Sequence, residues 1–209
     1  MNKKKLKIAV LGSTSGTDLE AVFTAIQKGE INAEIATVIS DKKNAYILER
    51  ARNYGIPALF IDPKDFKKRE DYDKNLIERL KFAQIDIVLL IGYMRILSSC
   101  FIGQYKNRII NIHPSLLPAF AGGMDLDVHK LVIDRGIKVT GCTLHFVDEG
   151  TDTGPIILQK AVEVNKDDTP QSLKEKVQKA EQEIIVEGIK LFQKGQLKVE
   201  NGKVEILSQ

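Results

Sequence analysis

The sequence contains no tryptophan, only two cysteines and no long apolar run. No stretch approaches the roughly 20 consecutive apolar residues that a membrane-spanning helix needs. Several lysines lie between Met1 and Lys7, but the apolar run that follows stops at Gly12, too short for the core of a signal peptide. Without an export signal, Cys100 and Cys142 are expected as reduced, unpaired thiols. We therefore predict a cytoplasmic protein with no membrane partner.

The chain also lacks an excess of charge of one sign. Its 31 lysines and arginines are interspersed with 28 aspartates and glutamates, which leaves a net charge of +3 and a pI near 8.7. Nucleic-acid-binding proteins usually gather basic residues on one face, so we expect no nucleic-acid partner. A chain of 209 residues with 43% hydrophobic content can bury one good core or two small ones. We predict a single domain over residues 1–209.

The first half of the chain alternates short β-branched runs with amphipathic segments. The runs that predict strands are Lys7–Leu11, Glu34–Ile39, Ala58–Ile61, Ile85–Ile91 and Arg108–Ile112. The segments that predict helices are Leu19–Gln27, Asn44–Asn53, Glu70–Ala83 and Ser98–Gln104. Strands that alternate with helices indicate an α/β fold, in which helices cover both faces of a mostly parallel, twisted sheet.

The second half has a different pattern. A helix is expected at Asp127–Asp134, and two long extended runs, Lys138–Val147 and Pro155–Val164, are joined by one loop, which makes the C-terminal strands partly antiparallel. Pro170–Lys194 has helical periodicity, with Asp168 and Thr169 as capping residues and Pro170 in the first turn. A terminal hairpin is expected around Asn201-Gly202.

The segment Gly12-Ser13-Thr14-Ser15-Gly16-Thr17-Asp18 separates the first expected strand from the first expected helix. Small residues at such a place let backbone N–H groups and the positive end of a helix dipole reach a phosphate. The alternative is a tight turn in which Thr17 or Asp18 is merely the N-cap residue. The segment is neither a P-loop nor the dinucleotide-binding fingerprint, and the missing Gly-Lys-Ser/Thr disfavours nucleotide hydrolysis.

Asn111 and His113 lie at the end of the fifth expected strand, and Pro114 follows them. Residues two apart in a strand point to the same side, so the amide and the imidazole would face one space at the carboxyl edge of the sheet, where open α/β sheets bind ligands. Asp152 lies in an acidic loop that could simply be solvated. If Asp152 folds back on His113, the three side chains supply a hydrogen-bond donor, a proton carrier and a carboxylate that raises the imidazole's proton affinity.

All three histidines, His113, His129 and His145, lie within one stretch of 33 residues counted from the sequence. Their spacing is long, and the close motifs typical of metal sites are missing, so we expect no metal site.

Three segments together resemble the folate-dependent formyltransferases. They are Gly-Tyr-Met-Arg-Ile-Leu at 92–97, Ile-Ile-Asn-Ile-His-Pro-Ser-Leu-Leu-Pro at 109–118 and Val-Asp-Glu-Gly-Thr-Asp-Thr-Gly-Pro-Ile-Ile at 147–157. The likeness covers residues 6–194. It implies a single formyltransferase domain, with a Rossmann-like, phosphate-binding half at 1–110 and a catalytic, folate-contacting half at 111–209.

The resemblance implies transfer of a formyl group from formyltetrahydrofolate, as co-substrate, to the amine of glycinamide ribonucleotide in purine biosynthesis, without a metal. Asn111 would donate to the formyl oxygen, His113 would stabilise the oxyanion and relay a proton, and Asp152 would orient the imidazole. The alternatives are a related enzyme that uses formyltetrahydrofolate, either a hydrolase or another amine formyltransferase, or a non-catalytic module that binds folate or nucleotide. The assembly would be a monomer or a homodimer.

The resemblance also implies substrate-binding residues. For the ribonucleotide they are Ser15, Gly16, Thr17, Asp18, Pro114 and Glu181. For the folate they are Arg69, Met94, Arg95, Ile96, Leu97, Asn111, Val147 and Asp148.

The chain departs from the family pattern at two places. Many relatives have asparagine where this chain has Asp18, and a carboxylate there would repel a phosphate dianion unless it turned away to cap the helix. The segment 119–127, Ala-Phe-Ala-Gly-Gly-Met-Asp-Leu-Asp, lacks the family's Pro-Gly-x-x-x-His pattern, although His129 follows two residues later.

Overall fold

The computed structural model describes residues 4–123 and 125–208. The chain divides into two compact units, Met1–Asn111 and Ile112–Gln209. Within the described residues, β1 to β7 belong to one sheet with the strand order β3-β2-β1-β4-β5-β6-β7. The pairs from β3 to β5 are parallel, whereas β6 and β7 are antiparallel, which confirms the predicted fold class.

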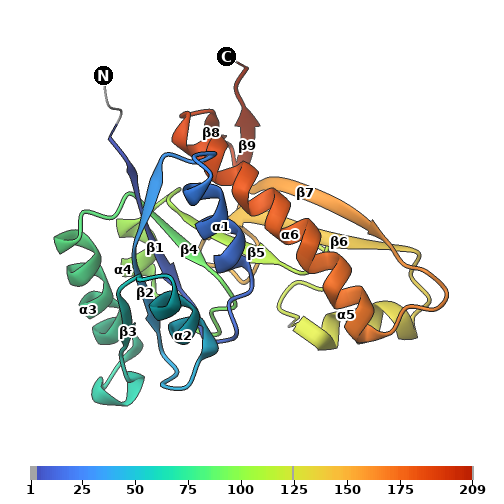
Figure 1. Ribbon diagram of the computed structural model, residues 1–209, viewed down its shortest axis with the longest axis horizontal. Helices are drawn as coiled ribbons and strands as arrows, with labels where there is room; N and C mark the ends of the chain where they lie inside the picture. Colours follow the sequence, from blue (N-terminus) through green and yellow to red (C-terminus); the bar gives the residue numbers. More distant parts are fainter. Residues whose placement is uncertain (1–3, 124, 209) are drawn as a thin grey trace. The chain divides into compact units, whose positions relative to one another are not determined.

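The first unit alternates strands and helices along the chain (Figure 1). The strands are β1 (Leu6–Leu11), β2 (Ala33–Ser40), β3 (Ala58–Phe60), β4 (Ile87–Leu90) and β5 (Ile109–His113), whose last two residues belong to the second unit. The helices are α1 (Asp18–Gln27), α2 (Tyr46–Asn53), the 3-10 turn η1 (Pro63–Asp65), α3 (Arg69–Phe82) and α4 (Ser99–Gln104).

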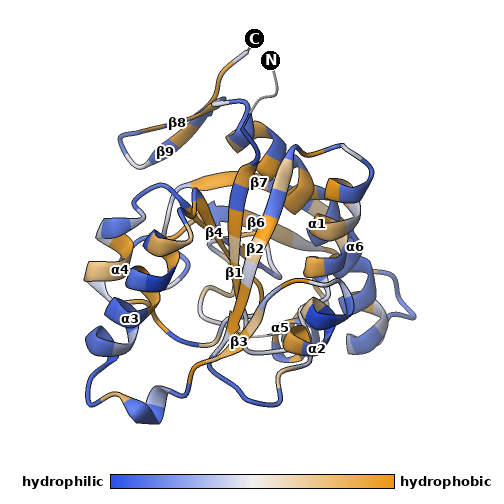
Figure 2. Cartoon of the chain, turned by 60° about the vertical axis from the view of Figure 1, so that its left-hand side comes forward, coloured by the Kyte–Doolittle hydropathy of each residue, from blue (hydrophilic) through white to orange (hydrophobic). Residues whose placement is uncertain are grey.

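The core of the first unit lies around its central strands. Ile8, Val10 and Leu11 of β1 are fully buried, and so are Ile87 and Val88 of β4. Their continuous apolar character is typical of parallel strands that are covered on both faces. Figure 2 shows α1 and α2 on one side of these strands and α3 and α4 on the other, as the sequence predicted.

The strand order switches direction between the neighbouring strands β1 and β4. From β1 the chain passes through α1 to β2 on one side, and from β4 it passes through α4 to β5 on the other. At such a switch in strand order, the loops leave the carboxyl ends of two neighbouring strands in opposite directions and leave room for a ligand. The loop 12–17 after β1 and the segment 91–98 after β4 both start here.

The second unit contains α5 (Asp125–Asp134), β6 (Val139–Phe146), β7 (Ile156–Glu163), α6 (Pro170–Gln193), β8 (Leu197–Glu200) and β9 (Lys203–Ile206). Helix α6 packs on β6, β7 and α5. Its amino end is a capping box in which Thr169 accepts from the N–H of Ser172 and the Ser172 hydroxyl accepts from the N–H of Thr169. Asn201 and Gly202 have φ angles of 50° and 72°, as the Asn-Gly hairpin turn requires.

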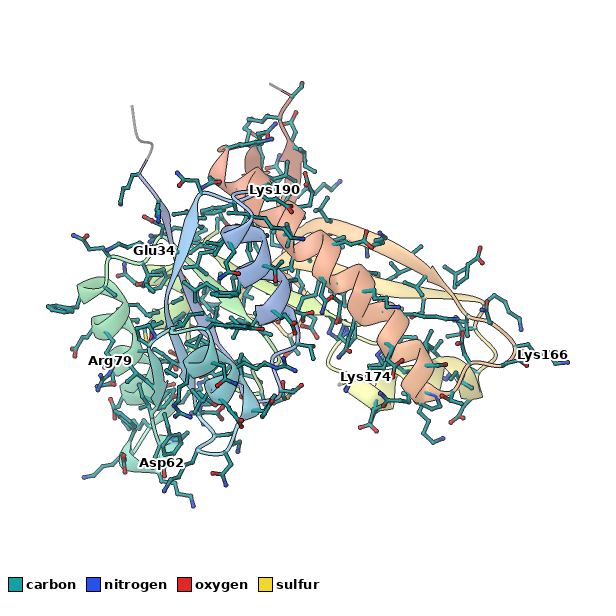
Figure 3. The ribbon with its side chains drawn as sticks, viewed as in Figure 1. Glu34, Asp62, Arg79, Lys166, Lys174 and Lys190 are labelled. Atoms are coloured by element: carbon teal, nitrogen blue, oxygen red, sulfur yellow. The ribbon has the colours of Figure 1, made fainter. Side chains whose placement is uncertain are left out.

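Charged side chains of both signs are spread over each unit. In Figure 3, Arg79 of α3 and Lys166 of the loop before α6 point away from the elements that carry them. Over the ranges 4–123 and 125–208, no helix is both long enough and apolar enough to cross a bilayer. Cys100 is exposed and Cys142 is buried, and neither forms a disulfide within the described residues.

Candidate active site

The loop after β1 is shaped by two glycines that lie against α2. A Cβ atom on Gly16, whose φ is 65°, would lie 2.3 Å from Cγ1 of Ile47, and one on Gly12 would lie 2.5 Å from Cδ1 of the same side chain. The N–H of Ile47 also donates to the carbonyl of Thr14. Only glycine fits at both places, so the loop is fixed tightly against the start of α2.

Three backbone donors of this loop are left without an acceptor. The N–H groups of Leu19 and Glu20 donate to the carbonyls of Gly16 and Thr17, but those of Ser15, Gly16 and Thr17 make no hydrogen bond with any described residue. They lie at the amino end of α1, where the helix dipole favours an anion. The loop thus has the donors that a phosphate group needs.

Asp18 is not the N-cap residue of α1, which was one of the alternatives for this position in the sequence. Thr17 occupies the N-cap position with helical φ and ψ angles, and no side chain there accepts a capping hydrogen bond. Asp18 is only 5% exposed, and its buried Oδ1 has no hydrogen-bond partner among the described residues. Burial raises the pKa of this carboxyl group to about 7.

Ser13, which the sequence analysis did not single out, joins the two loops at the strand switch. Its hydroxyl donates to Asp41 Oδ1 at 2.5 Å and accepts from the N–H of Met94 at 2.9 Å, while its own N–H donates to the carbonyl of Gly92. Two segments of the first unit are therefore hydrogen-bonded to one another: the loop 12–17, a candidate phosphate site, and the segment 92–97, which was predicted to bind folate. The serines of the loop were the only sequence signal for this role of Ser13, because its hydrogen-bond partners lie far away in the chain.

Helix α3 holds the other end of the segment 92–98. The guanidinium carbon of Arg95 lies 4.6 Å from the centre of the Tyr72 ring, and Asp73, which is buried, accepts from both the N–H and the hydroxyl of Ser98. On the same segment Met94 is 42% and Ile96 58% exposed, although both are apolar. Exposed apolar side chains on a fixed backbone are suited to contact a flat, largely apolar ring.

His113 and Asp152 come together in the second unit. Nδ1 of His113 lies 3.1 Å from Oδ2 of Asp152, and the side chains are 4% and 14% exposed. The other ring nitrogen, Nε2, lies 3.1 Å from the carbonyl oxygen of Phe120. Because both nitrogens face oxygen acceptors, both contacts are hydrogen bonds only when the ring carries a hydrogen on each nitrogen.

His145 is a second histidine at the same carboxylate, and the sequence analysis assigned it no role. Its Nε2 lies 3.6 Å from Oδ1 of Asp152, and its Nδ1 lies 2.8 Å from the carbonyl oxygen of Phe146. The ring is 2% exposed and is held near the end of β6, beside the bulge at Leu144 and His145. Asp152 thus lies between two imidazoles, one on each oxygen.

The surroundings of Asp152 strongly favour its ionised form. Burial alone would raise the pKa of this carboxyl group, but His113, His145 and the N–H of Gly122, which donates to Oδ2 at 2.9 Å, together hold the pKa well below its usual range. Asp152 therefore remains a carboxylate at any pH at which the protein would work.

The loop that carries Asp152 has a demanding geometry. Asp152 itself has a φ of 55°, in the left-handed region that aspartate tolerates better than most residues. Asp148 accepts from the N–H of Gly150 and the hydroxyl of Thr153, which closes the turn before it. A Cβ atom on Gly154 would lie 1.8 Å from the carbonyl oxygen of Phe146, so the turn can return to β7 only through glycine.

The remaining predicted residues occupy different positions. Asn111 lies on β5 opposite Leu90 of β4 and is half-buried, two residues before His113. In the second unit, Pro114 follows β5, Val147 and Asp148 follow β6, and Glu181 is buried on α6. Arg69 begins α3 with its guanidinium 3.7 Å from Glu70, a contact that gives no indication of a folate carboxylate.

Two residues of the segment 119–123, Phe120 and Gly122, contact the His113–Asp152 pair through their backbone. Met124 lies outside the described residues. His129 is buried on α5. Among the described parts of the chain, no group of three or more histidine, cysteine, aspartate or glutamate side chains is placed to hold a metal ion.

Comparison with known proteins shows the family of the chain. The model of the formyl transferase family matches residues 6–189, and the chain therefore belongs to that family. It is 38% identical to phosphoribosylglycinamide formyltransferase of Bacillus subtilis, over 84% of this chain and 88% of that protein. Its fold matches a crystal structure of glycinamide ribonucleotide transformylase 1 from Symbiobacterium toebii with a TM-score of 0.93 and 45% identity, over 98% of this chain and 95% of that one.

Two other relatives are larger proteins. The chain is 44% identical to a trifunctional purine biosynthetic protein of Drosophila melanogaster over 87% of its own length, but it spans only 13% of that protein. A crystal structure of a formyltetrahydrofolate deformylase from Pseudomonas syringae matches with a TM-score of 0.87 and 26% identity, over 98% of this chain and 67% of that one. The fold is thus shared by proteins named for formyl transfer and for formyl removal.

Proposed function

We propose that the chain transfers the formyl group of formyltetrahydrofolate to the amine of glycinamide ribonucleotide. The observation that carries this proposal is the pairing of His113 with Asp152, with Asn111 two residues before the histidine on the same strand. The names of the relatives support the choice of substrates.

In the proposed reaction the amine nitrogen attacks the formyl carbon, and the carbonyl oxygen becomes an oxyanion. Asn111 and His113 donate hydrogen bonds to this oxygen, and the formyl oxygen takes the place that the carbonyl of Phe120 holds on Nε2. Asp152 orients the imidazole and, through water, helps to take the proton that the amine loses. Collapse of the intermediate breaks the bond to the folate nitrogen, which takes up a proton as it leaves.

The remaining site residues are assigned to the two substrates. The N–H groups of Ser15, Gly16 and Thr17 hold the ribonucleotide's phosphate, and Pro114 and Glu181 contact the same substrate. The residues from Met94 to Leu97 contact the folate, and so do Val147 and Asp148. Arg69 would meet the glutamate part of the folate.

The test is a folate absorbance assay with the purified chain, formyltetrahydrofolate and glycinamide ribonucleotide. We expect a spectral change only when both substrates are present, with one formylated ribonucleotide formed for each folate released. A change without the ribonucleotide would indicate a hydrolase, as the deformylase neighbour suggests. Tight binding of both substrates with no turnover would indicate a binding module and would refute the proposal.

A further inference from the structure

The amino end of α1 combines two features that conflict if the loop binds a phosphate dianion. Three N–H groups, those of Ser15, Gly16 and Thr17, have no acceptor among the described residues and favour an anion. The next residue, Asp18, is an acid with a buried oxygen that has no hydrogen-bond partner. An ionised carboxylate beside a phosphate dianion would repel it, and the side chain has not turned away to cap the helix.

We propose that Asp18 takes part in phosphate binding as a neutral carboxylic acid, which donates its hydrogen to a phosphate oxygen. This inference rests on the proposed function, because the phosphate belongs to the ribonucleotide. The complex then holds one proton between carboxyl and phosphate oxygens, and no covalent bond other than the acid's O–H is involved. Above neutral pH, where the free protein has lost this proton, binding must take one up from solution.

Among the described residues of the first unit, no cationic side chain forms a hydrogen bond or ion pair with Asp18. Helix α1 packs on α2 and β2. Three charged side chains make contacts at the loop: Arg50 of α2, Glu20 of α1 and Asp41, which follows β2. Arg50 donates to the carbonyl of Ser15 and pairs with Glu20 at 3.3 Å, and Asp41 accepts from Ser13. Burial in the absence of such a partner raises the pKa of Asp18 to about 7, which makes the neutral form available near neutral pH.

The experiment measures binding of glycinamide ribonucleotide, and separately of inorganic phosphate, by titration calorimetry between pH 6.5 and 9. For the unchanged protein we expect the Kd of both to rise about five- to tenfold for each pH unit above 7, because one proton is linked to binding. Titrations in buffers of different ionisation enthalpy should show uptake of close to one proton at pH 8. Phosphate monoesters are dianions throughout most of this range, since their second pKa is about 6. Inorganic phosphate loses its own second proton near neutral pH, so its Kd is compared between the unchanged protein and Asp18→Asn at the same pH.

Asp18→Asn keeps a hydrogen-bond donor of the same shape but cannot ionise. The Kd of this variant for the ribonucleotide should change less than twofold between pH 7 and 9, with no proton uptake. The variant should therefore bind the ribonucleotide more tightly than the unchanged protein does at pH 8.5. Glu20→Gln is the matched control: it removes a negative charge from the same helical turn, at an exposed position, and should keep the pH dependence. Asp18→Ser, with thermal melting of each protein, covers the case in which the asparagine variant folds poorly.

Equal pH dependence in the unchanged protein and in Asp18→Asn would overturn the inference, and so would a failure of inorganic phosphate to bind at pH 6.5. The proposed function fails separately, if the ribonucleotide is not formylated. In that case the titrations with inorganic phosphate still decide the role of Asp18.

Discussion

Asp152 Oδ2 lies 3.1 Å from Nδ1 of His113, and the N–H of Gly122 donates to the same oxygen. Carboxylate, imidazole and loop backbone are thus joined by contacts that leave little freedom to the ring. A histidine oriented in this way presents its other nitrogen, Nε2, to whatever replaces the carbonyl of Phe120.

His113→Ala removes the group proposed to stabilise the oxyanion. We expect kcat to fall by about 10²–10⁴-fold, because a positioned proton-transfer or charge-stabilising group typically contributes that much. Steady-state kinetics with both substrates measures the loss, and circular dichroism checks that the protein still folds. Turnover within a few fold of the unchanged enzyme would refute the assigned role.

Asp152→Asn keeps the shape of the side chain but removes its charge. Turnover should fall by about 10²-fold or more, since the asparagine cannot stabilise a charged imidazole or accept the amine's proton. The same variant tests stability. The folded-state pKa of Asp152 is depressed, so its contribution to stability is present above the unfolded value of 3.8 and is lost as the pH falls below it. Urea unfolding between pH 2 and 6 should show a steeper acid loss for the unchanged protein than for the variant.

His145→Phe tests the second imidazole at Asp152. We expect kcat to fall about 10- to 100-fold with a smaller change in KM, because Asp152 loses the contact at Oδ1 and its orientation toward His113 is less fixed. His145→Gln, which can still donate a hydrogen bond from a similar position, should recover part of the loss. A phenylalanine variant with unchanged kcat would show that the contact has no role in turnover.

The sequence predicted the scaffold well because its signals are local. The buried runs Ile8–Leu11 and Ile87–Leu90 carry the β-branched pattern of covered parallel strands, and the Asn201-Gly202 turn determines its own geometry. Small differences occur at element ends: Ile85 was expected in β4, but its N–H donates to the carbonyl of Leu80, which makes it part of the turn that follows α3.

The sequence predicted that site residues lie together only where they belong to the same strand or the same loop. Asn111 and His113 lie two apart on β5, so their common side follows from strand geometry. The approach of Asp152 depends on a residue with φ of 55° and on the tight contact at Gly154, and neither is visible in a pattern of apolar residues. His145 was missed because every residue from Thr140 to Phe146 is buried, so strand alternation does not reveal its direction.

Gly154→Ala should disturb both stability and activity. Its Cβ would lie 1.8 Å from the backbone oxygen of Phe146, which cannot move aside cheaply, so we expect a loss of about 1–3 kcal/mol in unfolding free energy and a lower kcat as the Asp152 turn shifts. Gly29→Ala is the control, since its Cβ would meet open space at a φ of 71°: it should cost about 1 kcal/mol and leave turnover unchanged. Normal activity in Gly154→Ala would show that the turn adapts without moving Asp152.

Asp18 should also make the ligand-free protein less stable as the pH rises. Its folded-state pKa of about 7 lies above the unfolded value of 3.8, so between these values the folded state holds a proton that the unfolded chain has released. The unfolding free energy therefore falls from about pH 4 to about pH 7 by an amount on the order of 4 kcal/mol. Asp18→Asn should remove this slope: it should match the unchanged protein near pH 4 and be more stable at pH 8. Denaturant unfolding at both pH values measures the difference, with Glu20→Gln as the exposed control. If the stability gap between the two proteins is the same at pH 4 and pH 8, Asp18 ionises at its ordinary pKa, and the repulsion of phosphate by a carboxylate has to be relieved in another way.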